Sequence, residues 1–196
     1  MKTWIASDLH INHLNILKYC PDRWCNSRKL ESPDWSDVDS MNEKIISNWN
    51  STVSPEDDVY ILGDGCMGQI DKAPTYIRRL NGKKYLIAGN HDRTLRKLIK
   101  HNPENEDLFM WIRDYHSFYY GKGKQKNGIV MSHFPISHWD EMNKGAIMFH
   151  GHTHGTPTGL SGRIKDIGID TNNLFPYNFD DLVKDMLEIN VVRDHH

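Results

Sequence analysis

The chain has 196 residues, a formal net charge of −2 and 38% hydrophobic residues. This length predicts one domain over residues 1–196, with a core that needs no disulfides. No apolar run approaches the roughly 18 residues of a membrane span, and the N-terminal segment lacks a signal-peptide pattern. Three cysteines are too few for a disulfide framework, so the expected location is the reducing cytoplasm, with no membrane partner.

Histidine is the unusual component of the sequence. There are 12 histidines, and four of them lie between Pro135 and His154. The terminal pair, His195 and His196, could be the remnant of a purification tag. The positions of the other ten along the chain therefore need an explanation.

Charge is unevenly distributed along the chain. Residues 31–64 hold nine acidic residues and one lysine, whereas residues 71–100 hold nine basic and two acidic residues. One interpretation is that these are solvated helix faces of opposite sign. The other is that the basic segment helps to hold an anionic ligand. The overall charge argues neither for nor against nucleic acid as a partner.

The predicted elements alternate between strands and helices. Short β-branched and aromatic runs predict strands, and apolar residues at helical spacing predict helices. In chain order we expect strand Thr3–Ser7, helix Asp37–Trp49 capped by Asp37 or Ser40, strand Val59–Leu62, helix Ala73–Leu80, strand Lys84–Ala88, helix Thr94–Lys100, strands Arg113–Tyr120, Ile129–Ser132, Ile147–His150 and Ile167–Asp170, helix Phe179–Leu187 and strand Leu187–Val192. This alternation favours an α/β fold with a largely parallel sheet, in which ligands bind beyond the carboxyl ends of the strands.

Polar residues that can bind a metal follow five consecutive strands. They are Asp8 with His10, then Asp64, then Asn90, then His133, and finally His152 with His154. In an extended segment residues i and i+2 point the same way, so each Asp-x-His or His-x-His pair can hold one ion or reach a shared site. Glycines at 63, 89 and 151 fit sharp exits from the strands, where a positive φ is needed.

These positions provide seven candidate ligands. A tetrahedral zinc site uses four at most, so seven suit two ions with a shared carboxylate. A mixed oxygen and nitrogen set without thiolate fits Mn, Fe or Zn. Two ions about 3.5–4 Å apart form a clamp for displacement at phosphorus. The residues therefore predict a dinuclear site for phosphate chemistry.

The ordered set Asp-x-His, Gly-Asp, Gly-Asn-His-Asp, His and Gly-His-x-His resembles the calcineurin-like metallophosphoesterase superfamily. The resemblance runs from Ser7 to about Asn172. The segment from Ser7 to Ile16, with Met41-Asn42-Glu43 and Trp49-Asn50, is similar to small single-domain bacterial and phage-type members. The implied fold is α/β, with two mixed β-sheets packed as a sandwich and flanked by helices.

The resemblance also implies roles for the residues at the strand ends. Asp8, His10 and His154 would hold the first ion, and Asn90, His133 and His152 the second. Asp64 would bridge the two ions together with a water or hydroxide. His91 would be a general acid rather than a ligand, and Asp92 would orient it. Outside this set, His13 and Arg93 are candidate substrate-binding residues, with solvated surface as the alternative.

Together these features predict a dinuclear metal-dependent phosphoesterase, a phosphodiesterase or phosphatase. It would hydrolyse a small phosphodiester, nucleotide or cyclic nucleotide by attack of a metal-bridging hydroxide. The expected cofactors are two divalent ions, with Mn favoured for activity and Fe, Zn, Ni or Co as alternatives. Two other functions stay open: a nuclease or phosphatase that acts on nucleic-acid ends, and a metal-binding scaffold without turnover. Ala88 stands where protein phosphatases of the superfamily have arginine, which weakens a protein-phosphatase interpretation.

Overall fold

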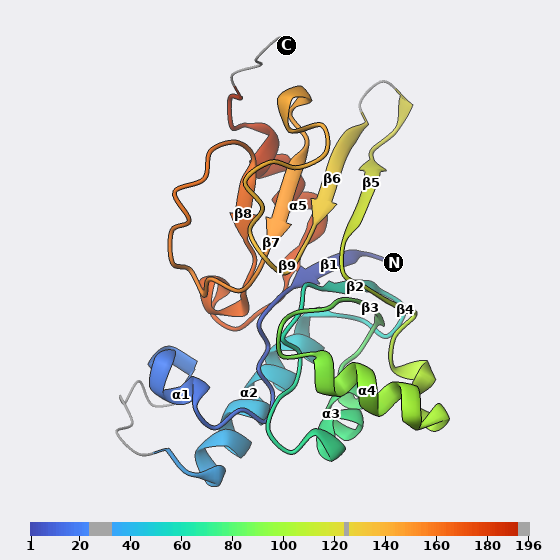
Figure 1. The fold of residues 1–196 in the computed structure, drawn as a ribbon, viewed down its shortest axis with the longest axis vertical. Coiled ribbons are helices and arrows are strands. Elements are labelled where there is room, and N and C mark those ends of the chain that lie inside the picture. Colours follow the sequence, from blue (N-terminus) through green and yellow to red (C-terminus); the bar gives the residue numbers. More distant parts are fainter. Residues whose placement is uncertain (24–32, 124–125, 192–196) are drawn as a thin grey trace.

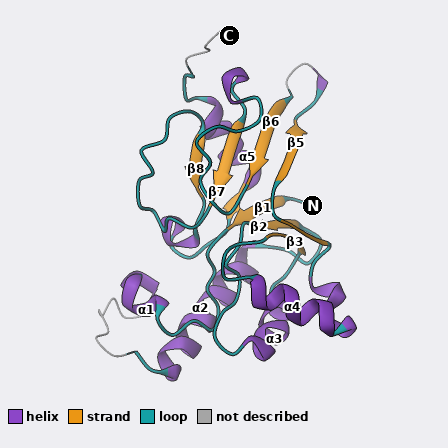
Figure 2. Cartoon of the chain, in the orientation of Figure 1, coloured by secondary structure: helices purple, strands orange, loops and turns teal. Residues whose placement is uncertain are grey.

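The structure of the protein, a computed structural model, describes residues 1–23, 33–123 and 126–191 (Figure 1). Two β-sheets pack against each other, with helices on the outer face of one of them (Figure 2). The first sheet has the strand order β4-β3-β2-β1-β9, and the second has the order β5-β6-β7-β8. The described part of the chain therefore confirms the two-sheet α/β architecture.

Both sheets are mixed. The first consists of β1 (Thr3–Ala6), β2 (Asp58–Ile61), β3 (Lys83–Ile87), β4 (Trp111–Arg113) and β9 (Tyr177–Asn178). Strands β1 to β4 are parallel, and β9 runs antiparallel to β1. The second sheet consists of β5 (His116–Tyr120), β6 (Asn127–Met131), β7 (Ile147–His150) and β8 (Ile164–Asp166). Here β6, β7 and β8 are parallel, and β5 is antiparallel to β6.

The helices are α1 (Ile16–Tyr19), α2 (Trp35–Thr52), α3 (Ala73–Arg79), α4 (Arg93–His101) and α5 (Phe179–Leu187). Helices α2, α3 and α4 lie on the outer face of the first sheet (Figure 1). No helix in the described ranges is long and apolar enough to cross a bilayer.

Strand alternation in the first sheet divides its apolar residues between two cores. Trp4 and Ala6 belong to the core beneath α2, α3 and α4, whereas Ile5 belongs to the core between the two sheets. This division follows from the period of two, which sends neighbouring side chains to opposite faces. Phe179 of α5 is fully buried in the core between the sheets. Packing in these cores fixes the position of the two sheets relative to each other. It therefore also fixes the relative positions of the loops at the strand ends.

Several sequence predictions of elements were wrong in detail. The expected strand Arg113–Tyr120 is divided between β4 and β5, which belong to different sheets. The expected strand Ile167–Asp170 is absent: β8 ends at Asp166, and a short 3₁₀ helix follows over Ile169–Asn172. Ile167 and Ile169 are nevertheless fully or almost fully buried, because this turn packs against the core. Burial, together with an isolated parallel β-bridge between Gly168 and Ser7, produced the strand-like pattern.

The N-terminus of α2 and the end of the chain also differ from expectation. The helix begins at Trp35, with Asp34 as its N-cap, because Asp34 and Asp37 form a reciprocal capping box. The predicted caps, Asp37 and Ser40, lie inside the helix. Leu187 ends α5 and is not the start of a strand, and no strand follows over residues 188–191. Val192, His195 and His196 lie outside the described residues.

Candidate metal centre

The candidate ligands come from loops at the carboxyl ends of β1, β2, β3, β6 and β7. Strands β1 to β3 are parallel in one sheet, and β6 and β7 are parallel in the other. Parallel strands end at the same edge of a sheet, so each sheet gathers its own loops at one edge. Packing of the sheets then brings the two edges together, and residues from both halves of the chain meet there.

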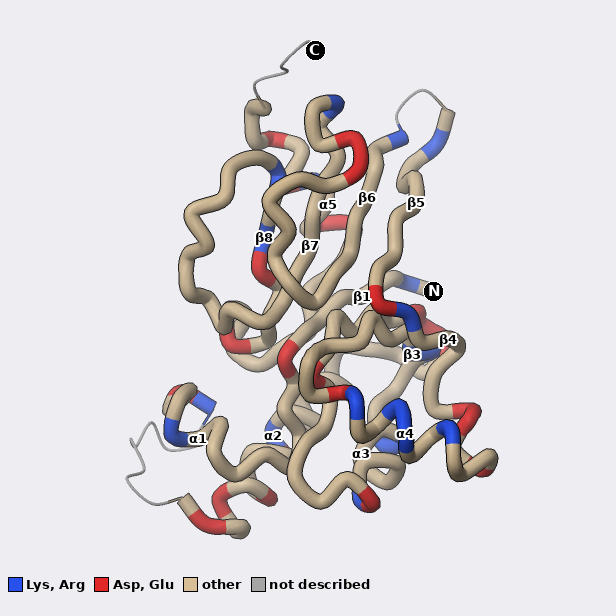
Figure 3. The backbone as a smooth tube through the Cα atoms, in the orientation of Figure 1, with Lys and Arg blue, Asp and Glu red and all other residues tan. Residues whose placement is uncertain are grey.

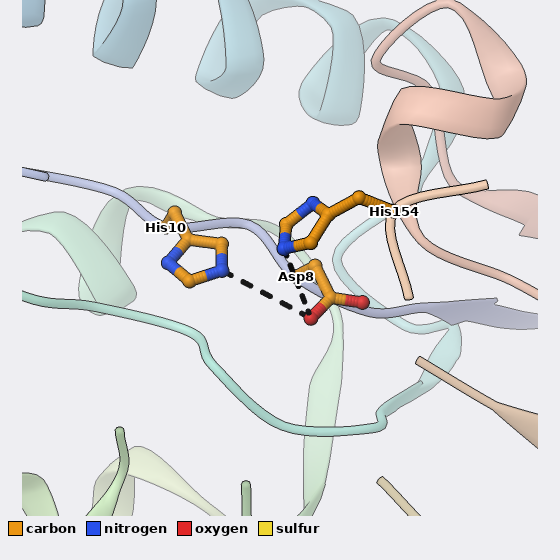
Figure 4. A group of neighbouring side chains, drawn as sticks. All are labelled: Asp8, His10 and His154. Carbon is orange, nitrogen blue, oxygen red and sulfur yellow. Dashed lines mark ion pairs between the residues drawn. The ribbon is translucent and has the colours of Figure 1, made fainter. Parts of the chain in front are cut away.

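One cluster consists of Asp8, His10 and His154 (Figure 4). The Nε2 atom of His10 lies 4.0 Å from Oδ1 of Asp8, and the Nε2 atom of His154 lies 3.9 Å from the same oxygen. The two imidazole rings are stacked with their centroids 5.0 Å apart. Two ring nitrogens and a carboxylate thus converge on one point.

A second cluster adjoins the first. The Nε2 atom of His133 lies 3.5 Å from Oδ2 of Asp64 and 3.0 Å from Oδ1 of Asn90. The ring of His152 lies beside that of His133, with the centroids 5.1 Å apart. Oδ2 of Asp64 is also 3.7 Å from Nε2 of His10. The Asp64 carboxylate therefore faces both clusters, and all seven predicted ligands lie in one region.

The Nε2 atom of His10 shows that these residues fit a cation. It is buried and has no hydrogen-bond partner among the described residues, although it faces two carboxylates. Buried polar atoms in native proteins are almost always paired. An ion at this position would provide the missing partner.

Backbone strain is concentrated at the same place. Five of the seven predicted ligands have a positive φ of 47° to 71°: Asp8, His10, Asp64, His152 and His154. Residues other than glycine rarely adopt this region, and each instance costs on the order of 1–3 kcal/mol. The fold holds these side chains in strained positions, which is typical of a functional site.

Glycines make room for the ligands. A Cβ atom at residue 89 would overlap the carboxylate of Asp64, and one at residue 151 would overlap the side chains of Ser7 and Asp8. Of the three glycines that were expected to need a positive φ, only Gly63 has one, at 90°. The other two positions require glycine for space and not for conformation.

Hydrogen bonds to the outer ring nitrogens orient two of the histidines. Nδ1 of His133 lies 2.8 Å from the carbonyl oxygen of Leu62, which can only accept. A proton on Nδ1 is donated to this carbonyl, which leaves Nε2, on the side of Asp64, as the ring nitrogen that could bind an ion. Nδ1 of His154 likewise donates to Oδ2 of Asp170 at 2.7 Å. Both arrangements are those of histidines prepared to bind a metal through Nε2.

Burial sets the charge states of the cluster. Burial raises the pKa of Asp8 to about 6, and burial together with the Arg23 charge lowers the pKa of His10. Burial also acts to lower the pKa of His154, but hydrogen bonds with Asp170 and Cys20 and the charge of Asp8 raise it to about 10. His10 is thus neutral near pH 7, as a ligand must be. Binding of an ion by His154 would displace a proton.

His91 lies at the mouth of the site. Its backbone N–H donates to Oδ1 of Asp64 at 3.0 Å, and its Nε2 is 3.9 Å from Oδ2 of the same carboxylate. The side chain is 40% exposed, so a substrate can reach it. This position agrees with the expected general acid, a role that stays a prediction.

Asp92 has contacts different from those expected. It is completely buried, and its carboxylate accepts hydrogen bonds from the backbone N–H groups of Asp64, Gly65 and Gly89. None of these bonds goes to the His91 ring, which Asp92 was expected to orient. The geometry makes Asp92 a support for the loops after β2 and β3, and any further part in catalysis stays a prediction.

The two candidate substrate residues border cavities on different sides of His91. His13, whose Nδ1 lies 3.1 Å from Nδ1 of His10, lines a cavity of about 530 Å³. Burial, followed by the charges of His91 and Arg23, lowers the pKa of His13 to about 4. Arg93 lines the other cavity, of about 330 Å³.

Sequence analysis missed two charged residues of the site, Arg23 and Asp170. They form an ion pair with N–O distances of 2.5 and 2.6 Å, and Asp170 also accepts the hydrogen bond from His154. Asp170 carried a usable signal, because it ends an apolar run that was interpreted as a strand. Arg23 carried none, since no local pattern marks a buried arginine.

Comparisons with known proteins agree with this geometry. The family described as calcineurin-like phosphoesterase matches residues 1–156. An uncharacterized protein of Methanocaldococcus jannaschii is 34% identical, over 71% of this chain and 73% of its own length. The gene 66 protein of Mycobacterium phage L5 is 30% identical over 86% of each chain. The crystal structure of a protein of unknown function from Aquifex aeolicus superposes with a TM-score of 0.67 at 21% identity, covering 93% of this chain and 98% of that one.

A two-sheet α/β fold with converging Asp, Asn and His side chains defines a metal-dependent phosphoesterase class. The chain belongs to the calcineurin-like phosphoesterase family. Its archaeal and phage relatives are small single-domain members. Members of the family use divalent metal ions to hydrolyse phosphoesters, and the matched domain covers most of this chain.

Proposed function

We propose that this protein is a dinuclear phosphoesterase that hydrolyses a small phosphodiester, with nucleotides and cyclic nucleotides among the candidate substrates. The observation that carries the proposal is the position of the Asp64 carboxylate. Its Oδ2 lies 3.7 Å from Nε2 of His10 and 3.5 Å from Nε2 of His133. A carboxylate between histidines of both clusters would be the ligand that two ions share.

The ligands divide between the two ions as follows. Asp8, His10 and His154 would hold one ion, Asn90, His133 and His152 the other, and Asp64 would be shared. The mixed oxygen and nitrogen set without a thiolate favours manganese for activity, with Fe, Zn, Ni and Co as alternatives. When bound, such ions supply Lewis acidity toward the phosphoryl oxygens and lower the pKa of a bound water to about 7.

The surrounding residues position the substrate and move its proton. The His91 side chain is 40% exposed and its Nε2 lies 3.9 Å from Oδ2 of Asp64, so His91 would be the general acid for the leaving oxygen. Its backbone N–H bond to Asp64 keeps the general acid and the shared ligand in fixed relation. The His13 ring lies 6.2 Å from the His91 ring, between centroids, and borders the same cavity, so it is placed to contact the phosphoryl group.

Two cavities favour a diester over a monoester. Both border His91, but otherwise they have different linings. The larger is bounded by Asn15, Tyr19 and Thr156, and the smaller by Met67 and Thr94, among other residues. A diester carries two organic groups on phosphorus, and each cavity can take one of them. A monoester would leave one cavity empty.

The exposed face of α4 supports a second candidate, action on nucleic-acid ends. Arg93, Lys97 and Lys100 are exposed, and none has an ion pair within the described ranges. Figure 3 shows Lys and Arg along this helix. Because Arg93 borders the smaller cavity, the basic face begins at the site. A nucleic-acid substrate predicts binding that weakens strongly as salt increases, and affinity unchanged by salt would contradict it.

The test is a substrate and metal panel on the full chain. Bis-p-nitrophenyl phosphate, p-nitrophenyl phosphate and cyclic nucleotides are each assayed with Mn, Ni, Co, Zn and Mg. Asp64→Ala should abolish turnover of every ester. His91→Ala should lower turnover of an alkyl ester by about 10²–10⁴-fold, and that of a nitrophenyl ester less, because nitrophenolate leaves with little need of a proton.

A matched control is His138→Ala, which changes an exposed histidine outside the clusters and should leave turnover unchanged. Undiminished rates in both site variants would refute the proposed function. Metal binding by the wild-type protein without turnover of any ester would favour the scaffold alternative.

A further inference from the structure

We propose that Arg23 and Asp170 are positioning residues that hold two metal ligands, Asp8 and His154, in place for the first ion. This inference rests on the proposed dinuclear function. The two residues lie 147 positions apart in the chain. Neither belongs to the motifs that define the family resemblance.

Arg23 is fully buried, and its guanidinium donates four hydrogen bonds to described residues. Nε and one terminal nitrogen donate to the two carboxylate oxygens of Asp170, at 2.6 and 2.5 Å. The terminal nitrogens also donate to the carbonyl oxygens of Leu9, at 2.8 Å, and Asp8, at 2.6 Å. A buried charge is costly unless it is paired and hydrogen-bonded. Arg23 therefore fixes the strained backbone at Asp8 relative to Asp170.

Asp170 connects Arg23 to the other proposed ligand, His154. Its Oδ2 accepts from Arg23 and also from Nδ1 of His154, at 2.7 Å. This bond turns the opposite nitrogen of the ring, Nε2, toward Asp8, where the N–O distance is 3.9 Å (Figure 4). The pair of the buried Arg23 and the largely buried Asp170 thus sets the position of both Asp8 and His154, which come from loops of different sheets.

Another interpretation of this region is a third cation site. Cys20, His154 and Asp170 lie close enough together to surround an ion, and Sγ of Cys20 is 3.7 Å from Nδ1 of His154. Both oxygens of Asp170, however, already accept from the Arg23 guanidinium. The positive charge of Arg23 opposes a second cation beside it. The contacts therefore assign Asp170 to holding His154 and not to binding an ion.

A carboxylate is needed at position 170 because an ionised carboxylate accepts hydrogen bonds and donates none. It takes three N–H donors at once, two from Arg23 and one from His154. An asparagine has one acceptor oxygen, so either orientation of its amide turns an NH₂ group toward a donor. Arg23→Lys likewise removes the planar fork that reaches Asp170 and the two carbonyls together. Both new residues are close in size to the natural ones, and both substitutions should weaken binding of the first ion.

The experiment is a titration of the full chain with Mn²⁺, followed by calorimetry and by electron paramagnetic resonance. The wild-type protein should bind two ions. In Asp170→Asn and Arg23→Lys, one of the two sites should weaken by about 10–100-fold while the other stays within about twofold. The double variant Asp170→Asn with His154→Ala should lose less affinity at that site than the two single losses of binding free energy added together, because part of the Asp170 effect is transmitted through His154. A merely structural role would instead weaken both sites and add to the His154 effect.

Asp57→Asn is the matched control. Asp57 is also buried and also accepts three N–H donors, but they belong to Lys2, Trp4 and Ser54, outside the metal clusters. This variant should lose stability and keep both Mn²⁺ affinities. If neither site variant folds, the position of the proton on the His154 ring is measured in the wild-type protein loaded with Zn²⁺. The His154 ring should then carry its proton on Nδ1, and a proton on Nε2 would overturn the proposal.

The possible results separate this inference from the proposed function. Wild-type turnover combined with unchanged Mn²⁺ affinities in both site variants would overturn the inference alone. Binding of two ions by a wild-type protein that hydrolyses no ester would overturn the proposed function alone. A wild-type protein that binds no divalent ion would overturn both.

Discussion

Asp92 provides a sharp test of how the site is held together. Its carboxylate is 0% exposed and accepts the N–H groups of Asp64 and Gly89 at Oδ2, at 2.7 and 2.8 Å, and that of Gly65 at Oδ1, at 3.1 Å. We expect Asp92→Ala to release the loop that carries Asp64, the proposed shared ligand. We expect Asp92→Asn to do so only in part, because its amide oxygen can still accept from Asp64 and Gly89.

The size of each effect follows from the number of lost acceptors. A buried donor left without an acceptor costs about 1–3 kcal/mol. Asp92→Ala orphans three such groups, and some relaxation is expected, so the free energy of unfolding should fall by about 3–5 kcal/mol. Asp92→Asn orphans one group, at Gly65, and should cost about 1–2 kcal/mol. The first loss approaches the whole stability of a marginal domain, about 5 kcal/mol.

Urea unfolding of the metal-free proteins at pH 7 measures both values. Asp114→Asn is a suitable control, because it changes a carboxylate that is 75% exposed and paired with Arg96. That substitution should stay within about 0.5 kcal/mol of the wild type. A loss below about 1 kcal/mol in Asp92→Ala would refute the reasoning, since it would mean that the three bonds contribute almost nothing.

Metal affinity distinguishes the two tasks considered for Asp92. If Asp92 holds the Asp64 loop, both Asp92 variants should bind Mn²⁺ more weakly than the wild type. If Asp92 instead acted on His91, Mn²⁺ affinity would be unchanged and only turnover would fall. The hydrogen bonds in the structure predict the first result.

Three further predictions concern space, pH and metal. Gly151→Ala should cost about 1–3 kcal/mol and weaken Mn²⁺ binding, because its Cβ would overlap Ser7 and Asp8; wild-type values in urea unfolding and titration would contradict this. The N–H bond from Lys2, followed by that from the Trp4 indole, lowers the pKa of Asp57. The stability due to Asp57 is therefore complete well above the unfolded-state pKa of about 4 and is lost as pH falls through the lower folded-state pKa. The difference between wild type and Asp57→Asn in urea should shrink from pH 6 to pH 3, and a constant difference would count against the bonds. Finally, Mn²⁺ at about 100 times its Kd should raise the free energy of unfolding by about 2.7 kcal/mol per site over a chelated sample, and equal stabilities would exclude binding to the native state.

The sequence by itself determined the order of the ligands and the elements that carry them. The helix Phe179–Leu187 was predicted with its observed ends, and β7 was predicted as Ile147–His150. These features depend on local periodicity, which a single chain displays directly. The strand-end positions of Asp, Asn and His then followed, since an α/β fold gathers the ends of parallel strands.

Only the tertiary structure decided what supports those ligands. The division of Arg113–Tyr120 between two sheets depends on how the sheets pack. The alternation of apolar residues along a strand is the same in either sheet, so it cannot show which sheet a strand joins. Asp92 was expected to orient His91, its neighbour in sequence, but its carboxylate oxygens accept hydrogen bonds from the loops after β2 and β3. The pairing of Arg23 with Asp170 joins residues 147 positions apart. Such contacts have no local pattern, because burial and hydrogen bonding between distant segments exist only once the chain has folded.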